Sequence, residues 1–270
     1  MKKAIAKYYQ IESAKIAPSD FPTRIVFLSD LHNVEIGVNN EALLSKIDSL
    51  SPDLVLLGGD TIVGKPNKTM TSGLDLIKAL GKRYQVYAAN GNHEHRLKIY
   101  PETYGDMYER YLEAIEESKV RLINNESASI SINNTPMIIH GLDIDRQYYG
   151  RLERQELTTE DINNYLGPIE DEGYHILLAH NPRYCQSYID WGADLTLAGH
   201  YHGGIIRLAK DIPLIGNDFQ LFPPFAYGHY EKNNHHLITS AGLGEHTIPI
   251  RINNPRELVV VDLIGKHEKE

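Results

Sequence analysis

Short apolar runs typical of buried β-strands alternate with helical patterns in the first third of the chain. The runs cover residues 24–30, 52–60 and 83–92 and are rich in Val, Ile, Leu or Tyr. Between them, residues 39–50 and 71–82 place apolar side chains at helical spacing. A strand–helix–strand–helix–strand order at this spacing predicts parallel strands joined by crossover helices. The alternation therefore assigns the chain to the α/β class.

The remainder of the chain continues with both kinds of element. A β-hairpin is predicted to turn at Asn133 and Asn134. No internal repeat or linker divides the sequence, so we expect one domain over residues 1–270. The other predicted elements are helices at 103–119 and 158–167 and strands within 128–142 and at 174–180, 193–200 and 256–265.

Composition excludes some classes of function. A net charge of −9 argues against a broad nucleic-acid interface, which needs a basic surface. Cys185 is the only cysteine, so no intramolecular disulfide can form. The first 24 residues lack the apolar core of a signal peptide, and no apolar run approaches the roughly 20 residues of a membrane-spanning helix. We expect a soluble, cytoplasmic protein.

Polar side chains gather where five of the strand-like runs end. In α/β sheets, ligands bind beyond the carboxyl ends of the strands, so we expect the five clusters to share one site. Neighbouring Gly, Asn and Pro residues permit the tight turns that aim side chains into such a site. Each cluster alone could be an ordinary polar turn, but five in succession favour a site. The clusters are SDLHN (Asp30, His32), GGD (Asp60), GNHE (Asn92, His93), AHNP (His180) and GHYH (His200, His202).

These clusters supply imidazole nitrogens together with carboxylate and amide oxygens. Such a donor set suits Mn, Fe, Co or Zn better than Ca or Mg alone. Seven donors are too many for one four-coordinate ion that keeps an open position. They fit two ions that share a bridging carboxylate at about 3.5–4 Å separation. The candidate metal ligands are Asp30, His32, Asp60, Asn92, His180, His200 and His202.

The ordered motifs resemble those of the calcineurin-like metallophosphoesterase superfamily, over roughly residues 22–264. Together with the C-terminal TSAGLGEH stretch, they are most similar to its bacterial YkuE/YaeI-like phosphodiesterase branch, which includes enzymes acting on UDP-diacylglucosamine. The resemblance implies a metallo-dependent phosphatase-like fold. That fold is a four-layer α/β/β/α sandwich, in which helices flank two mixed β-sheets around a dinuclear metal centre.

The resemblance also implies a role for each motif residue. Asp30, His32 and His202 resemble the ligands of the first metal, and Asn92, His180 and His200 those of the second. Asp60 resembles the bridging carboxylate. His93 matches a histidine that binds no metal and acts on the leaving group or the phosphoryl oxygens. The expected cofactors are two Mn, Fe or Zn ions.

The implied reaction is hydrolysis of a P–O bond by in-line attack of a metal-bridging hydroxide. His93, as imidazolium, would donate a proton to the departing oxygen. We expect a phosphodiesterase acting on a small-molecule or lipid-linked phosphoester, with no nucleic-acid partner. A phosphomonoesterase of the same fold and a non-catalytic metal-binding interaction scaffold remain alternatives.

Glu94 departs from the motif of the branch, and two further groups of residues, tyrosines and histidines, belong to none of its motifs. Glu94 replaces the usual Asp of the GNHD motif; phosphoprotein phosphatases have Glu there, but GGDTIVG lacks the second Asp and the Arg of their neighbouring motif. A tyrosine-rich stretch after GNHE could roof the site, although helix packing explains it equally well. Those tyrosines are Tyr100, Tyr104, Tyr148 and Tyr149. The remaining histidines are expected mostly on the surface or in loops: His95, His140, His175, His229, His235, His236, His246 and His267.

Overall fold

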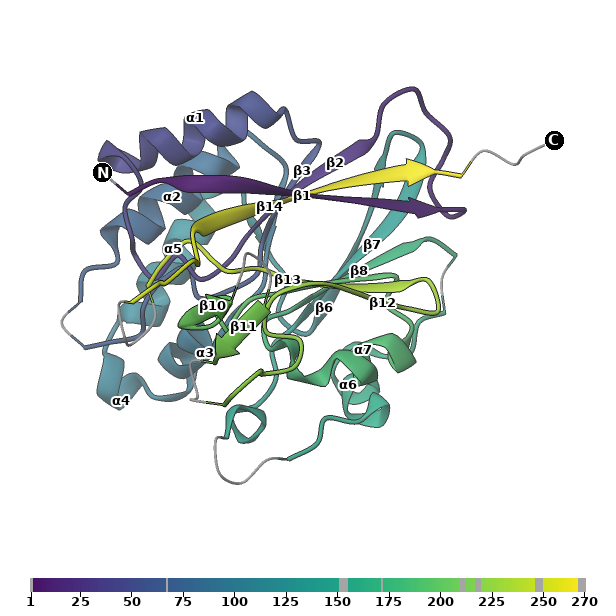
Figure 1. The fold of residues 1–270 in the computed structure, drawn as a ribbon. Helices are drawn as coiled ribbons and strands as arrows, with labels where there is room; N and C mark the ends of the chain where they lie inside the picture. Colours follow the sequence, from purple (N-terminus) through teal and green to yellow (C-terminus); the bar gives the residue numbers. More distant parts are fainter. Residues whose placement is uncertain are drawn as a thin grey trace.

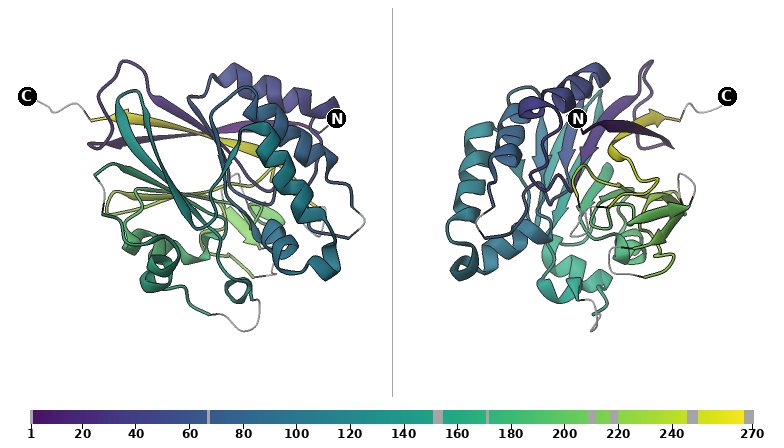
Figure 2. Two further views of the ribbon diagram at one scale, coloured as in Figure 1. Left: turned by 180° about the vertical axis from the view of Figure 1, so that it is seen from behind. Right: turned by 60° about the vertical axis from the view of Figure 1, so that its left-hand side comes forward.

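Two six-stranded β-sheets face each other, and helices cover both outer faces (Figure 1). This architecture comes from a computed structural model that describes residues 2–66, 68–150, 155–170, 172–208, 212–216, 220–245 and 250–266. Figure 2 shows the layers from two further sides. The arrangement confirms the predicted α/β/β/α sandwich.

The first sheet has the strand order β1-β14-β2-β3-β4-β5. Strands β2 to β5 run parallel, as the strand–helix alternation predicted. Strand β14 lies antiparallel to β2 and parallel to β1, so the two ends of the chain pair in one sheet. The bounds are β1 Ala4–Ser13, β2 Thr23–Leu28, β3 Leu54–Leu57, β4 Val86–Ala88, β5 Arg121–Leu122 and β14 Arg256–Gly265.

The second sheet has the order β12-β13-β9-β8-β7-β6. Strands β7, β8, β9 and β13 run parallel, and antiparallel hairpins form both edges. A separate pair of short strands, β10 (Ile206–Leu208) and β11 (Ile212–Ile215), lies beside the two sheets. The bounds are β6 Glu126–Ile132, β7 Thr135–Leu142, β8 Tyr174–Ala179, β9 Leu195–Ala198, β12 Gly228–Lys232 and β13 His235–Thr239.

Helices on the outer faces complete the layers. Helices α1, α2 and α5 cover the first sheet, and α6 and α7 cover the second. The bounds are η1 Val38–Asn40, α1 Glu41–Leu50, α2 Thr71–Gly81, α3 Asn92–Ile99, α4 Pro101–Tyr104, α5 Met107–Ser118, η2 Arg146–Tyr149, α6 Thr159–Leu166, η3 Pro182–Tyr184 and α7 Cys185–Trp191. No helix in these described ranges is long and apolar enough to cross a membrane.

Alternate side chains of the parallel strands enter two different cores. On β2, Phe27 points into the core between the sheets, whereas Val26 packs against the outer helices. Leu56 and Val55 divide in the same way on β3. Because both faces are covered, these strands are apolar at nearly every position, and their sequences therefore form continuous apolar runs.

Helices α3 and α7 were not predicted from the sequence, and two further differences concern strand β1 and the helix expected at 103–119. Strand β1 was not predicted, because it is an edge strand in which only Ile11 is buried and polar residues interrupt every apolar run. The helix predicted at 103–119 is divided into α4 and α5, since Gly105 adopts a left-handed conformation with φ of 60°. Neither difference moves the strand ends that carry the polar clusters.

Candidate metal centre

All seven candidate ligands and His93 meet where strands of the two sheets end. Asp30 and His32 follow β2, and Asp60 follows β3. Asn92 and His93 open helix α3 directly after β4. The second sheet contributes the three others from the ends of β8 and β9: His180, His200 and His202.

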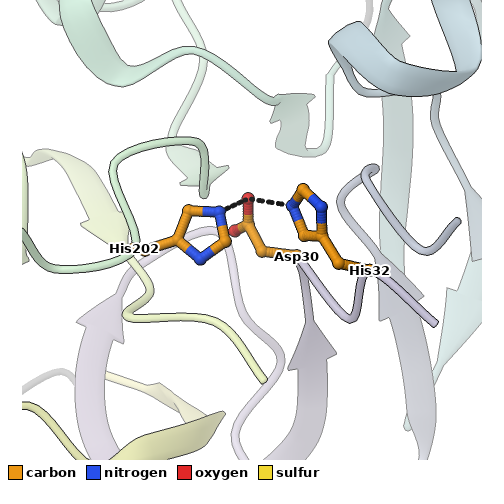
Figure 3. Close-up of side chains that lie close together, drawn as sticks. All are labelled: Asp30, His32 and His202. Atoms are coloured by element: carbon orange, nitrogen blue, oxygen red, sulfur yellow. Dashed lines mark ion pairs between the residues drawn. The ribbon is translucent and has the colours of Figure 1, made fainter. Parts of the chain in front are cut away.

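Asp30 lies between two of the histidines. Its Oδ1 atom is 3.3 Å from Nε2 of His202 and 3.9 Å from Nε2 of His32. Figure 3 shows the two rings approaching the carboxylate from either side. These three side chains are close enough to hold one ion.

Asp60 lies at the centre of the candidate site. Its Oδ2 atom is 3.2 Å from Nε2 of His180 and 3.5 Å from Nε2 of His32. Asp30, Asp60 and His180 form a second group that could hold an ion. The Asp60 carboxylate therefore faces donors of both groups.

Asn92 and His200 close the second group. Asn92 Oδ1 is 2.8 Å from His200 Nδ1, so the amide oxygen and the ring nitrogen contact each other. The His200 ring lies 5.3 Å from the His180 ring, centroid to centroid. His180 Nδ1 is 2.7 Å from the Gly58 carbonyl oxygen, and this contact directs its Nε2 atom toward Asp60.

Buried polar atoms without partners test whether metal ions fit. Nε2 of His32 and Nε2 of His180 are buried and make no hydrogen bond with the described residues. Asp30 and Asp60 are 0 % and 2 % exposed, respectively. Leaving the two ring nitrogens buried without a hydrogen bond is costly. Ions bound among these atoms would satisfy them, so the residues fit transition-metal binding.

The electrostatics of the cluster keep both carboxylates charged. Burial alone would raise the pKa of Asp30, but His202 and His32 lower it overall. Burial likewise opposes the lowered pKa of Asp60, which His180 and His93 produce. Against the opposing effect of burial, Asp60 raises the pKa of His180 to about 10. Opposite charges thus dominate over desolvation for Asp30, Asp60 and His180.

Glu94 organises the turns that present Asp60 and Asn92. Its buried carboxylate accepts hydrogen bonds from the backbone N–H groups of Asp60 (2.8 Å), Ile62 (3.0 Å) and Gly91 (3.0 Å). Burial, followed by the charge of Asp60, raises its pKa to about 7. Sequence reasoning missed this role, although a Glu three residues after a helix N-cap is a capping signal.

Arg251 and Asn254 hold the turn that carries His202, and both were also missed. The Arg251 guanidinium donates to the carbonyl oxygens of Ala241 (2.9 Å) and Gly244, and its Nη2 lies 3.4 Å from His202 Nδ1. Asn254 donates to the His202 carbonyl oxygen at 2.7 Å. Burial lowers the pKa of Arg251 to about 10. Arg251 and Asn254 lie about 50 positions from His202 in the sequence, so no local sequence pattern predicts these contacts.

Two donors face Nδ1 of His93, an arrangement that favours a neutral ring over the expected imidazolium. Its Nδ1 accepts the Gly64 backbone N–H at 2.8 Å and lies 2.9 Å from Arg96 Nη2. Burial lowers its pKa to about 3, although Asp60 opposes the shift. A neutral ring whose Nδ1 accepts these contacts carries its proton on Nε2, which is 4.0 Å from Asp60 Oδ2.

A cavity of about 620 Å³ opens over the cluster. Tyr104 and Tyr149 line it, and the Tyr149 ring lies 5.4 Å from the His200 ring. Tyr100 instead packs against Arg146, and Tyr148 is buried in the core beneath α6 and α7. Two of the four tyrosines in the predicted stretch thus border the site.

Three of the remaining histidines, His95, His140 and His175, are less exposed than predicted. His95 is buried on α3 with Nδ1 2.7 Å from Asp143 Oδ1, and it borders the cavity rather than a solvated loop. His140 and His175 form a buried pair on the second sheet, and their nitrogens are 3.0 Å apart. Strands β12 and β13 carry three more: His229, His235 and His236. His246 and His267 lie outside the described residues.

Comparison with known proteins places these motifs in one family. The sequence profile described as calcineurin-like phosphoesterase matches residues 23–204. The uncharacterized metallophosphoesterase YkoQ of Bacillus subtilis is 27% identical over 89% of this chain and 83% of its own length. Phosphodiesterase YaeI of Escherichia coli is 24% identical over 90% of this chain and 83% of its own.

A third relative has a named lipid-linked substrate. UDP-2,3-diacylglucosamine pyrophosphatase LpxG of Chlamydia muridarum is 26% identical over 68% of this chain and 65% of its own length. The profile covers all five polar clusters, from the end of β2 to the turn after β9. The chain belongs to the calcineurin-like phosphoesterase family and is a metal-dependent phosphoester hydrolase.

Proposed function

We propose that the protein is a two-metal phosphodiesterase. The observation that carries this proposal is the position of Asp60, whose carboxylate faces donors of both ligand groups. Asp30, His32 and His202 would hold one ion, and Asn92, His180 and His200 the other. Asp60 would bridge the two. Manganese, iron and zinc all match this donor set.

In the proposed reaction, the candidate ligands would hold the two ions and His93 would contact the phosphoester. When bound, the two ions supply an activated water and neutralise phosphoryl charge. His93 would present its Nε2–H to the phosphoryl or departing oxygen as a hydrogen-bond donor. A neutral imidazole can serve as such an electrophile, and the Gly64 contact at Nδ1 fixes the required tautomer. Positioning and charge stabilisation supply most of the catalysis in phosphoryl transfer.

A diester is favoured over a monoester by the room above the cluster. The cavity of about 620 Å³ falls in the range that holds a drug-sized ligand, so an alcohol group on each side of phosphorus can be accommodated. The resemblance to a protein named phosphodiesterase agrees with this preference. A non-catalytic scaffold would not need His93, whose ring is oriented by two donors beside Asp60. We infer a small-molecule or lipid-linked phosphoester as substrate, the latter in keeping with the name of LpxG.

Hydrolysis of bis(p-nitrophenyl) phosphate by metal-stripped protein, with and without added Mn²⁺, tests this proposal. We expect turnover only with the metal. His93→Ala should retain its metal in elemental analysis and lose about 100- to 10,000-fold in turnover. An exposed substitution, Glu113→Gln on α5, serves as the control and should keep full activity. Metal-loaded protein without activity on any diester would refute the proposal, and metal loss in His93→Ala would refute the role of that histidine.

A further inference from the structure

Three potential metal ligands lie together on the β12–β13 hairpin, outside the metal centre. His229 Nε2 is 3.0 Å from His236 Nδ1, and the same His236 nitrogen is 3.9 Å from Glu231 Oε2. One donor atom from each of the three side chains lies within 4.8 Å of the other two. None of these three residues lines the cavity over the metal centre. We call His229, Glu231 and His236 the hairpin cluster.

The register of the hairpin places the three side chains on one face of the second sheet. Glu231 stands directly opposite His236. His229, two residues before Glu231, stands opposite Ile238. Opposite residues of an antiparallel pair point to the same side of a sheet, as do residues two apart on one strand. Ile238 belongs to the apolar core between the sheets, so the hairpin cluster faces the first sheet.

The hairpin cluster lies at the margin of the sandwich, where β1 and β12 are the outermost strands of their sheets. The ring of Tyr9, on β1, is 5.8 Å from the His229 ring, centroid to centroid. His236 is only 8 % exposed, whereas His229 and Glu231 reach solvent. An ion can therefore approach from solvent, while the inner ring is held by the core.

The hairpin cluster and the metal centre lie toward opposite ends of the parallel strands. His236 pairs in register with Leu195, at the start of β9. His200 and His202 follow the end of that strand, after Ala198. Three residues of a β-strand span about 10 Å, so the two groups of donors are separate sites.

The distances between the donor atoms suit a zinc ion. Two ligand atoms bonded to tetrahedral zinc at about 2.0–2.1 Å lie about 3.3 Å apart. The separations of 3.0 Å and 3.9 Å in the hairpin cluster are close to that value. Zinc binds two imidazoles and one carboxylate with a fourth position open for water. Imidazole ligands also favour zinc over magnesium and calcium.

We propose that His229, Glu231 and His236 bind a zinc ion that joins β12 to β13. The ion would be additional to those at the metal centre, and the inference does not rest on the proposed phosphodiesterase function. Within the described ranges, β12 pairs only with β13. An ion bonded to both strands would therefore fix the edge strand of the second sheet.

The number of zinc ions bound per chain tests this inference. Untagged protein is stripped of metal, dialysed against excess Zn²⁺, passed through gel filtration and submitted to elemental analysis. The variants are His229→Gln and Glu231→Gln, both at exposed positions. His235→Gln is the matched control. It removes the adjacent imidazole, which lies on the other face of β13 with its Nδ1 2.7 Å from the Ala193 carbonyl oxygen.

We expect His229→Gln and Glu231→Gln each to bind one zinc ion fewer than the wild-type protein, and His235→Gln to match the wild type. Losing a ligand should weaken binding by more than the roughly 10- to 100-fold cost of losing an outer partner of a ligand. The expected difference of one ion is the same however many ions the metal centre holds.

Equal zinc content in the wild type and both hairpin-cluster variants would overturn the inference, because the two rings would then form only a hydrogen-bonded pair. Loss of the same ion in His235→Gln would also overturn it, since zinc would then bind the hairpin without depending on this cluster.

Discussion

Five of the seven candidate ligands adopt a left-handed backbone conformation that residues other than Gly rarely adopt. Their φ angles lie between 49° and 69°. Such a conformation costs of order 1–3 kcal/mol per residue, so it persists only where the surrounding structure enforces it. Backbone strain of this kind is concentrated at functional sites. The five residues are Asp30, His32, Asp60, His200 and His202.

The ligands could be found from the sequence, whereas the residues that hold them could not. Asp30-Leu31-His32 and its counterparts stand directly after apolar runs, so a local pattern locates them. Arg251 contacts the turn of His202 from 49 positions away. Glu94 reaches across to the turn after β3. Such contacts depend on the folded arrangement of the strands and leave no local pattern beyond a capping signal.

Glu94→Gln tests the role of Glu94 in holding the turns around Asp60. The carboxylate accepts three backbone N–H groups, and a Gln amide would direct its own donors at some of them. We expect the free energy of unfolding to fall by about 1–3 kcal/mol, as measured by urea denaturation of the metal-free protein. Glu113→Gln, exposed on α5, provides the reference. Equal stability of the two variants would show that Glu94 does not support these turns.

At the level of elements, strands buried on both faces were predictable and edge strands were not. Strands β2, β3 and β8 are fully covered and therefore apolar at nearly every position. Strand β1 is half exposed and pairs only with β14, so its sequence lacks a continuous apolar run. The site is assembled from the ends of the strands that were predicted correctly. Its residues could therefore be identified from the sequence, although the edge strands of the sheets could not.

Gly199 permits β9 and β2 to approach closely at the metal centre. A Cβ atom at this position would lie 2.2 Å from Asp30 Oδ2. We expect Gly199→Ala to displace the Asp30 carboxylate and to lower metal-dependent turnover about 100-fold, because small misplacements of reacting groups have effects of that size. Glu113→Gln, an exposed change on α5, serves as the control. Comparable activity of Gly199→Ala and Glu113→Gln would contradict this account of the strand approach.

Across the whole molecule, the candidate ligands join the two sheets. Asp30 and Asp60 follow strands of the first sheet, and His180 and His202 follow strands of the second. The same sheets share an apolar core, which Phe27 and Ile176 enter from opposite sides. We propose on this basis that the whole chain unfolds as one domain.

Metal binding should therefore stabilise the entire fold rather than one loop. At a free Mn²⁺ concentration 100 times the dissociation constant, the expected gain is about 2.7 kcal/mol. Thermal denaturation with and without Mn²⁺ measures it, and a single transition should move as a unit. Asp60→Asn should lose most of the gain, because the central carboxylate faces both groups of donors. If Mn²⁺ shifted the transition of Asp60→Asn as much as that of the wild-type protein, the ion would be binding elsewhere.

The most direct test of the central claim is electron paramagnetic resonance of metal-stripped protein loaded with two equivalents of Mn²⁺. Two ions that share Asp60 at about 3.5–4 Å would be coupled and would give the multiline spectrum of a dinuclear centre. The account predicts that spectrum for the wild-type protein and its loss in Asp60→Asn. A spectrum of isolated Mn²⁺ ions alone would contradict a shared site at the ends of these strands.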